Sequence, residues 1–320
     1  MNKKAFWVAA YSAFVQYYDY HLLGYLAAKI AKYFVPDSDH VVQLLNAYLI
    51  ITLSVLAKPV GALFLGKIGD IYGRSSVFNI SLIGIAFSSF IIAITPSYQQ
   101  IGLASTLILL LARMSMCALV STGIDSIRIY IYEHINSKKQ CFGVGITAIF
   151  TQAGSLAASL SAFFFTLEIL PDYSWRFAFI LGSIMSVIAV YLKRRLKVKD
   201  DINLKDDINF KEFSNLSISS VIKKNFALFL YSIILVGAIG STTQFITIFF
   251  GTYNFDVLKI VKPSTMQFYT SITIAVYMIF SLIAGYTADH IGRYKTVYIG
   301  GFLTMLVCFG HIYFLSKKSN

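Results

Sequence analysis

Residues 58–76 read KPVGALFLGKIGDIYGRSS, a short polar turn between two long apolar runs. The ordered positions of this turn are Gly66, Asp70, Gly73 and Arg74. The same spacing of glycines, acid and base returns downstream at Gly285, Asp289, Gly292 and Arg293. A loop that recurs in register between hydrophobic runs indicates an internal repeat, and here the repeated unit is a membrane bundle.

Each position of the repeated loop has a physical role. The first glycine of each copy is expected to let two helices end close together, and the second to occupy a left-handed or crowded turn position. Asp70 and Arg74 can pair with each other or cap helix ends at the water interface. The loop is therefore expected to be a latch at a membrane surface.

Both loops resemble the signature loop of the major facilitator superfamily, which lies between spans two and three and again between spans eight and nine. Lys58-Pro59-Val60-Gly61 resembles the Arg-Pro-Leu-Gly of its metabolite:proton symporter branch, home of proline/betaine transporters, with Lys58 in place of arginine. Tyr18-Asp19-Tyr20 with Gly24 resembles the Phe-Asp-Phe…Gly pattern of the first span in that branch.

A further match lies before the sixth span. Trp175-Arg176-Phe177 with Phe179 resembles the branch pattern Trp-Arg-x-Pro-Phe, with Ala178 in place of proline. The resemblance covers the whole chain. It implies an all-α integral membrane protein with the major facilitator fold, of which this sequence has about nine of the usual twelve transmembrane helices.

Composition gives the broad class independently. Of the 320 residues, 57% are hydrophobic and only 13% are charged, whereas a soluble domain is nearer a quarter charged. The net charge of +12 comes from bases in short segments between apolar runs, which is typical of membrane orientation and not of nucleic-acid binding. Membrane lipid is thus an expected partner, and nucleic acid is not.

Nothing in the sequence favours an enzyme or a cofactor. The three cysteines are isolated, and there is no Cys/His metal spacing and no paired-carboxylate motif. The histidines are scattered: they are His21, His40, His134, His290 and His311. We therefore expect no metal, no cofactor and no enzymatic activity.

A span needs about 20 apolar residues, and nine segments qualify. They are roughly residues 5–28, 43–65, 77–95, 101–127, 141–166, 174–192, 225–251, 265–286 and 295–315. The first carries tyrosines and an aspartate and is too long for a cleaved signal peptide, so we expect it to be retained.

Orientation and domains follow from the bases. With the N-terminus inside, the inner segments hold 17 lysines and arginines and the outer ones 7. The positive-inside rule therefore predicts a cytoplasmic N-terminus, in a bacterial inner membrane.

Residues 1–192 are expected to form an N-terminal six-helix lobe, 193–224 a cytoplasmic linker, and 225–320 a partial C-terminal lobe of three helices. The basic linker can alternatively dock anionic lipid.

Charges inside spans are functional candidates because burying them is costly. Asp19 lies beyond the middle of the first span, where a desolvated carboxylate can hold a proton; the alternative is an outer-interface residue bonded by neighbouring tyrosines. Arg113 lies near the middle of the fourth span, where its charged guanidinium needs a carboxylate partner or an aqueous cavity. Its alternative role is a structural bond to backbone carbonyls.

The inner half of the fourth span carries a polar stripe, with Ser121, Asp125, Arg128 and Tyr132 on one face. Asp125 and Arg128, three residues apart, can pair. The stripe fits either a transport path or the end of a span at the interface. The branch has a Gly-Gly-Glu near here, and its acid is absent from this chain.

Three further sets remain open. Lys58, before the helix-breaking Pro59, is either an interface anchor or a cation that contacts a substrate carboxylate. Polar residues of the seventh span that can line a cavity or bond back to their own helix are Thr242, Thr243, Gln244 and Thr247. The tyrosines beside Asp19, which are candidates for an aromatic cage, are Tyr17, Tyr18 and Tyr20.

The function expected from these residues and this resemblance is secondary active transport. The solute is a small polar metabolite or osmolyte, such as proline, betaine or an organic acid, moved by proton symport and alternating access. The alternative is a truncated, transport-inactive relic or a subunit of a split transporter. Only three spans follow the linker. We therefore expect either a separate C-terminal fragment, whose spans complete the cavity, or little transport by this chain alone.

Overall fold

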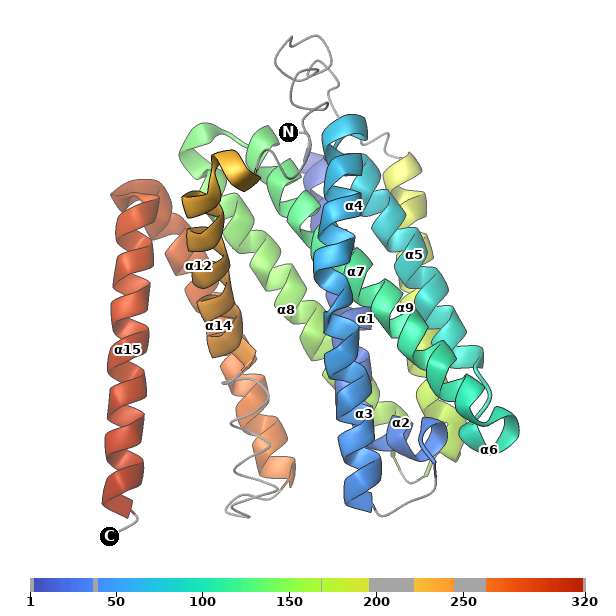
Figure 1. Cartoon of the computed structure of the whole chain (residues 1–320). Helices are drawn as coiled ribbons and strands as arrows, with labels where there is room; N and C mark the ends of the chain where they lie inside the picture. Colours follow the sequence, from blue (N-terminus) through green and yellow to red (C-terminus); the bar gives the residue numbers. More distant parts are fainter. Residues whose placement is uncertain (1–2, 37–39, 168, 196–221, 245–262, 319–320) are drawn as a thin grey trace.

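The structure, a computed structural model, describes residues 3–36, 40–167, 169–195, 222–244 and 263–318, and this part of the chain is helical without strands (Figure 1). The helices of the first part are α1 (Lys3–Tyr25), α2 (Ala27–Phe34), α3 (His40–Val55), α4 (Ala57–Tyr72), α5 (Arg74–Ile94), α6 (Tyr98–Ile101), α7 (Leu103–His134), α8 (Gln140–Phe165) and α9 (Trp175–Arg195). Those of the second part are α12 (Phe226–Gln244), α14 (Pro263–Ile291) and α15 (Arg293–Lys318). Two single turns of 3₁₀-helix, η1 (Ser137–Lys139) and η2 (Asp172–Ser174), precede α8 and α9.

Helices fall on all nine predicted spans. Six described segments are long and apolar enough to cross a membrane by length and composition: Tyr48–Tyr72, Arg74–Ile94, Leu103–Glu133, Ser137–Phe165, Asp172–Arg195 and Ile272–Ile291. The other three predicted spans correspond to α1, α12 and α15. Most of the predicted linker, and the end of the seventh span, lie outside the described residues.

The second predicted span is one helix with a break. Pro59 has no N–H to donate to the carbonyl of Val55, and its ring crowds that carbonyl. The helix accordingly stops at Val55 and restarts at Ala57, and the Leu56 N–H bonds instead to the Leu53 carbonyl at 3.1 Å. The predicted disturbance is confirmed, but it lies before Pro59. Lys58 therefore sits in the first turn of a new helix.

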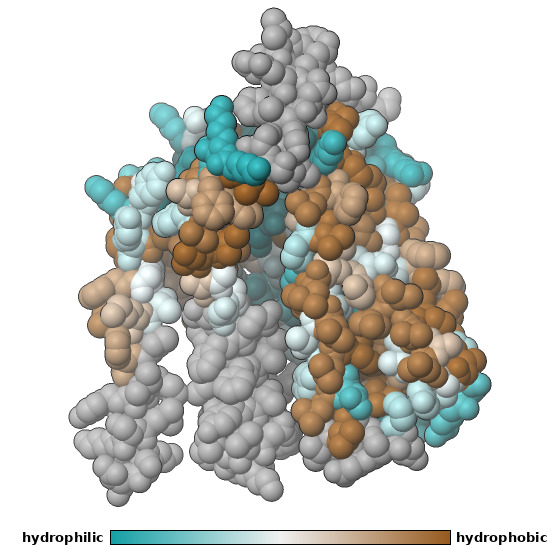
Figure 2. Space-filling model, viewed as in Figure 1, coloured by the Kyte–Doolittle hydropathy of each residue, from teal (hydrophilic) through white to brown (hydrophobic). Residues whose placement is uncertain are grey.

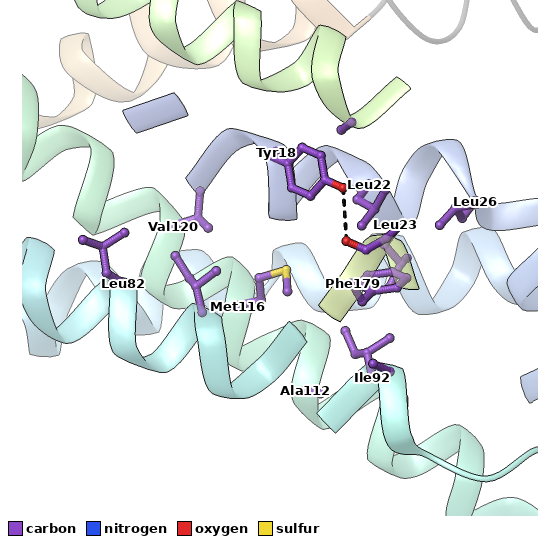
Figure 3. Close-up of a cluster of buried hydrophobic side chains, with 14 of the residues drawn as sticks. Tyr18, Leu22, Leu23, Leu26, Leu82, Ile92, Ala112, Met116, Val120 and Phe179 are labelled. Carbon is purple, nitrogen blue, oxygen red and sulfur yellow. Dashed lines mark hydrogen bonds between the residues drawn. The ribbon is translucent and has the colours of Figure 1, made fainter. Parts of the chain in front are cut away.

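The core of the first bundle is built around α1, which packs against α5, α7, α8 and α9. Figure 3 shows buried apolar side chains from α1, α5, α7 and α9, and from Leu26 just after α1, meeting there. They are Tyr18, Leu22, Leu23, Leu26, Leu82, Ile92, Ala112, Met116, Val120 and Phe179. The Tyr18 hydroxyl donates to the Ala178 carbonyl at 3.1 Å, which satisfies the one polar atom of that buried ring. The core thus fixes the rotation of α1 about its axis.

The outer surface is apolar. Large side chains such as Phe64, Phe87, Leu111 and Phe163 are exposed, and Figure 2 shows hydrophobic residues over most of the visible helices. An aqueous surface would not carry so much contiguous apolar area. The chain is a multi-pass membrane protein.

Polar contacts tie the ends of the helices together. At one end, Arg176 donates to the Ala93 carbonyl at 3.2 Å and the Thr95 carbonyl at 2.9 Å, and so holds α9 to the end of α5. At the other end, the buried Lys193 donates to the Ser75 carbonyl. Figure 1 places the α4–α5 turn, the α7–α8 turn and the end of α9 at this same end, near the N-terminus.

Candidate functional site

The first repeated turn joins α4 to α5. Gly73 has φ +90°, a conformation that side chains disfavour, and it lets the chain reverse within one residue. Asp70 and Arg74 form an ion pair of 2.9 Å on the surface, as the sequence predicts. Gly66 lies inside α4, and a Cβ there would meet no described atom within 4 Å, so the close helix approach predicted at this glycine stays a prediction.

The second repeated turn, between α14 and α15, has Gly292 at φ +102°. Here the close helix approach is confirmed. A Cβ on Gly285 would lie 2.7 Å from the Cys141 carbonyl oxygen, and one on Gly145 would lie 2.8 Å from the Ser281 carbonyl oxygen. Small residues at these crossing points allow α14 to pack backbone to backbone on α8.

The acid of the second turn caps another helix. Asp289 accepts hydrogen bonds from the backbone N–H groups of Cys141 (2.9 Å) and Phe142 (2.8 Å), in the first turn of α8. These N–H groups have no partner within their own helix, and the helix dipole favours an anion there. The hydrogen bonds of Asp289 thus add to the close packing at Gly145 and Gly285 in holding α14 against α8.

Arg293 completes this contact. Its Nη2 donates to Gln140 Oε1 at 3.0 Å, and its guanidinium lies 5.0 Å from the centre of the Tyr132 ring. We name the set Asp289, Arg293, Gln140 and Tyr132 the α8–α14 latch. Gln140 and Arg293 are 153 residues apart in the sequence. Nothing near Gln140 in the sequence therefore indicated that it would contact the second repeated turn.

Asp19 is fully buried inside the first bundle. Ser89 of α5 donates to its Oδ1 at 2.5 Å, and Ser186 of α9 donates to its Oδ2 at 3.3 Å. A Cβ on Gly182 of α9 would collide with Oδ1, so the glycine makes room for the carboxylate. Both oxygens therefore face α5 and α9, and they are held by serines, not by tyrosines.

Two cations from other helices meet on the neighbouring residue, Tyr20. Lys58 of α4 donates to the Tyr20 hydroxyl oxygen at 2.9 Å, and its Nζ lies 4.7 Å from the ring centre. Arg113 of α7 donates from Nη1 to the Tyr20 carbonyl at 2.8 Å, and its guanidinium carbon lies 4.8 Å from the same ring centre. Arg113 thus makes a hydrogen bond to a backbone carbonyl, which was one of its two predicted roles. It also makes a cation–π contact with the Tyr20 ring.

Tyr17, Tyr18 and Tyr20 do not form the aromatic cage that the sequence suggested, because Tyr18 lies on a different face of α1. Helical geometry places residues i, i+3 and i+4 on one face, so Tyr17, Tyr20 and His21 come together, with ring centres 5.0–6.3 Å apart. Tyr18 is turned into the core toward Ala178 (Figure 3). We name Tyr17, Tyr20, His21, Lys58 and Arg113 the Tyr20 cluster.

The polar stripe of α7 lies toward the latch end of the molecule. Asp125 and Arg128 pair at 3.3 Å, as predicted, and both are partly exposed. Ser121 bonds back to the Ala118 carbonyl of its own helix, and Tyr132 belongs to the latch. The side chains of Thr242, Thr243, Gln244 and Thr247 lie outside the described residues.

The structure therefore joins some of the predicted residues and separates others. Lys58 and Arg113 share one tyrosine, whereas Asp19, one residue away, is bonded to serines of α5 and α9. Gln16, one helical turn before Asp19 on α1, is fully buried, and neither of its amide atoms has a hydrogen-bond partner in the described structure. The described residues contain no cluster of three or more His, Cys, Asp or Glu side chains suited to a metal.

Comparison with known proteins adds the relationship. The chain is 28% identical over 298 residues to the "Putative proline/betaine transporter" of Staphylococcus aureus strain COL, covering 91% of this chain and 63% of that protein. It is 27% identical over 200 residues to the "Proline/betaine transporter" of Escherichia coli K12, covering 61% and 40%. The chain thus spans less than two thirds of the length of these relatives. Neither name supports the alternative of a transport-inactive relic.

A solved structure shares the fold. The proton:xylose symporter XylE, bound to 6-bromo-6-deoxy-D-glucose, superposes with a TM-score of 0.66 at 14% identity, covering 91% of this chain and 70% of that one. The profile of the Major Facilitator Superfamily matches residues 9–320. Taken with the repeated turns and the helical bundle, these matches show that the chain belongs to the major facilitator superfamily.

Proposed function

We propose that this chain moves a small polar metabolite across a bacterial inner membrane by alternating access, coupled to protons. The observation that carries the proposal is the Tyr20 cluster, where two cations lie within membrane spans without an acidic partner among the described residues. Charges at that depth are costly and mark substrate or ion pathways. An enclosed solute of complementary charge offsets their cost.

The related proteins support the same direction. Two relatives carry names that refer to proline and betaine, and the solved neighbour is a proton:xylose symporter. All of these are small polar solutes. Figure 2 shows the surface hollowed between the α12 side and the α4 side, with hydrophilic residues inside the hollow. A solute path between the two parts of the chain fits this arrangement.

Proton coupling is assigned to Asp19. Its carboxyl group is fully buried and held by two hydroxyl groups, with no cation within ion-pair distance in the described part of the chain. In such surroundings a carboxyl group exchanges a proton only when water reaches it. Movement of α1 relative to α5 and α9 would couple that exchange to transport.

Alternating access is assigned to two lobes, residues 1–192 and 225–320, joined by a cytoplasmic linker. The α8–α14 latch supports this division, because it fastens the second part to the first at one end of the bundle. Such a contact can open and close as rigid lobes rock about a central site. On the count of bases, the latch end and the N-terminus face the cytoplasm.

Uptake in intact cells tests this proposal. Cells that express the chain are given radiolabelled proline, glycine betaine, citrate and related acids, with and without a protonophore, beside cells with empty vector. We expect uptake of at least one solute above the vector level and loss of accumulation with the protonophore. Uptake of every solute at the vector level, with the chain present in the membrane, would contradict the proposal.

A further inference from the structure

Neither cation of the Tyr20 cluster has a carboxylate within ion-pair distance among the described residues. Arg113 is 3% exposed, and its Nε has no hydrogen-bond partner. Its only acceptors in the described structure are the Tyr20 carbonyl and, at 3.4 Å, the Met116 sulfur. A guanidinium is built to bind a carboxylate through two parallel N–H groups, and here that capacity is unused.

The described carboxylates that make hydrogen bonds or ion pairs make them with groups other than Lys58 and Arg113. Asp19 is held by Ser89 of α5 and Ser186 of α9. The acids paired with other cations are Asp70, Asp125 and Asp172. Asp289 caps α8. The cluster therefore carries an excess of positive charge within a low-dielectric region, and a bound anion would offset it.

The ring at the centre of the cluster is already occupied by cations. The Lys58 ammonium and the Arg113 guanidinium both lie within 5 Å of the Tyr20 ring centre. The edge of His21 packs on the same ring, with centres 5.0 Å apart. An aromatic cage for a quaternary ammonium needs free ring faces and no competing cation. At Tyr20 two cations already lie against the ring and would compete with such a ligand.

The broken helix adds to the positive field. Lys58 is the second residue of α4, whose first residue, Ala57, follows the break at Leu56 without a side-chain cap. The first-turn N–H groups of a helix lack intrahelical partners and carry partial positive charge. A broken helix that presents this end inside a membrane protein is a recurring way to hold an anionic group.

We propose that the Tyr20 cluster selects a small carboxylate with net negative charge, and that it discriminates against betaine-like solutes. Lys58 and Arg113 bind the carboxylate, while Tyr20 positions both by its hydroxyl and carbonyl oxygens. The proposal rests on the transport function proposed above, and it names the substrate class of that site. A quaternary ammonium group would meet two like charges at the Tyr20 ring.

Ligand binding to the purified full chain in lipid nanodiscs tests this without requiring transport. Succinate, citrate, lactate and glycine betaine are each titrated by calorimetry. We expect at least one of the three carboxylates to bind about tenfold or more tightly than glycine betaine. Lys58→Gln should weaken that binding by about 10- to 100-fold, the usual range for losing a charge-assisted hydrogen bond.

Three further variants separate the effect of charge from an effect on folding. Lys58→Arg keeps the cation and should retain binding to within a few fold, which a purely structural role of the lysine would not predict. Lys138→Gln removes an exposed positive charge from η1, outside the cluster, and should leave binding unchanged. Arg113→Gln is expected to weaken binding as Lys58→Gln does.

The outcomes are distinct. Binding of none of the three carboxylates, or glycine betaine binding as tightly as the best of them, would overturn the proposal. Carboxylate binding that is unaffected by Lys58→Gln would overturn it as well. Binding that depends on Lys58, in a protein that shows no uptake of any solute, would support the anion site and count against the transport function.

Discussion

At the scale of single residues, neighbouring positions on α1 have separate surroundings. Asp19 is enclosed by α5 and α9, and Tyr20 meets α4 and α7. The 100° step between adjacent helical residues is enough to place a carboxyl group in the bundle core and a tyrosine under two cations. The proposed proton site and the proposed substrate site thus share one helix without an ion pair between them.

The first prediction concerns these two sites. At least one of the variants Asp19→Asn and Arg113→Gln should abolish the proton dependence of uptake, because each removes a buried charged or protonable group for which the described structure offers no substitute. The pH dependence of initial uptake rates is the measurement. Asp172→Asn, which alters an exposed acid paired with Lys29, is the control. Normal proton-driven accumulation in both variants would rule the assignment out.

The second prediction concerns the space beside Asp19. Gly182→Ala places a Cβ against the Asp19 carboxyl oxygen and the Tyr18 ring, and should lower the free energy of unfolding by about 1–3 kcal/mol, as overpacking in a core does. Thermal unfolding in detergent measures this effect. Gly24→Ala, where a Cβ meets no described atom within 4 Å, should not destabilise. Equal stability of the two variants would contradict the close packing of Gly182 against Asp19 and Tyr18.

At the scale of elements, the two repeated turns are alike in backbone and unlike in contacts. Gly73 and Gly292 both have positive φ, as their spacing predicts. In the first turn the acid pairs with its own arginine, whereas in the second Asp289 and Arg293 bind α8 and Gln140. A repeat in sequence therefore predicts local geometry, while the partner of each side chain depends on which helix lies nearby.

The third prediction concerns both turns. Asp289→Asn weakens an anion on a helix N-terminus, and Gly73→Leu forces a branched side chain into a left-handed conformation. Each change, like Asp70→Asn, should cripple turnover and leave substrate affinity roughly intact, because these turns lie far along the helices from the Tyr20 cluster. Uptake rate and binding affinity are measured on the same preparations. A large loss of affinity with normal turnover would contradict a latch.

At the scale of the whole molecule, the sequence predicted much of the fold and less of the site. Apolar runs of span length identify the helices, since lipid leaves few alternatives for the backbone. The partners of Asp19, which are 70 and 167 residues away, leave no mark on a single sequence because serine is common in spans. The role of Tyr20 depends on α4 and α7 converging on α1, which only packing decides.

The fourth prediction concerns topology. Residues 67–76, 133–140 and 193–224 should all face the cytoplasm, because most of the lysines and arginines between spans lie on this side. Single cysteines at positions 70 and 205, in a background without native cysteines, should resist an impermeant maleimide in intact cells and react after permeabilisation. A cysteine at position 29 should react from outside. Labelling of position 70 or 205 in intact cells would invert the assignment.

The central claim is proton-driven movement of a solute by this chain, and accumulation in proteoliposomes tests it most directly. The purified chain is reconstituted, an inward proton gradient is imposed, and entry of radiolabelled succinate, citrate, proline and glycine betaine is followed beside protein-free liposomes. The account predicts transient accumulation of a carboxylate above its outside concentration, and no accumulation once an ionophore dissipates the gradient. Entry of all four solutes at the protein-free rate, or accumulation that is insensitive to the ionophore, would contradict it.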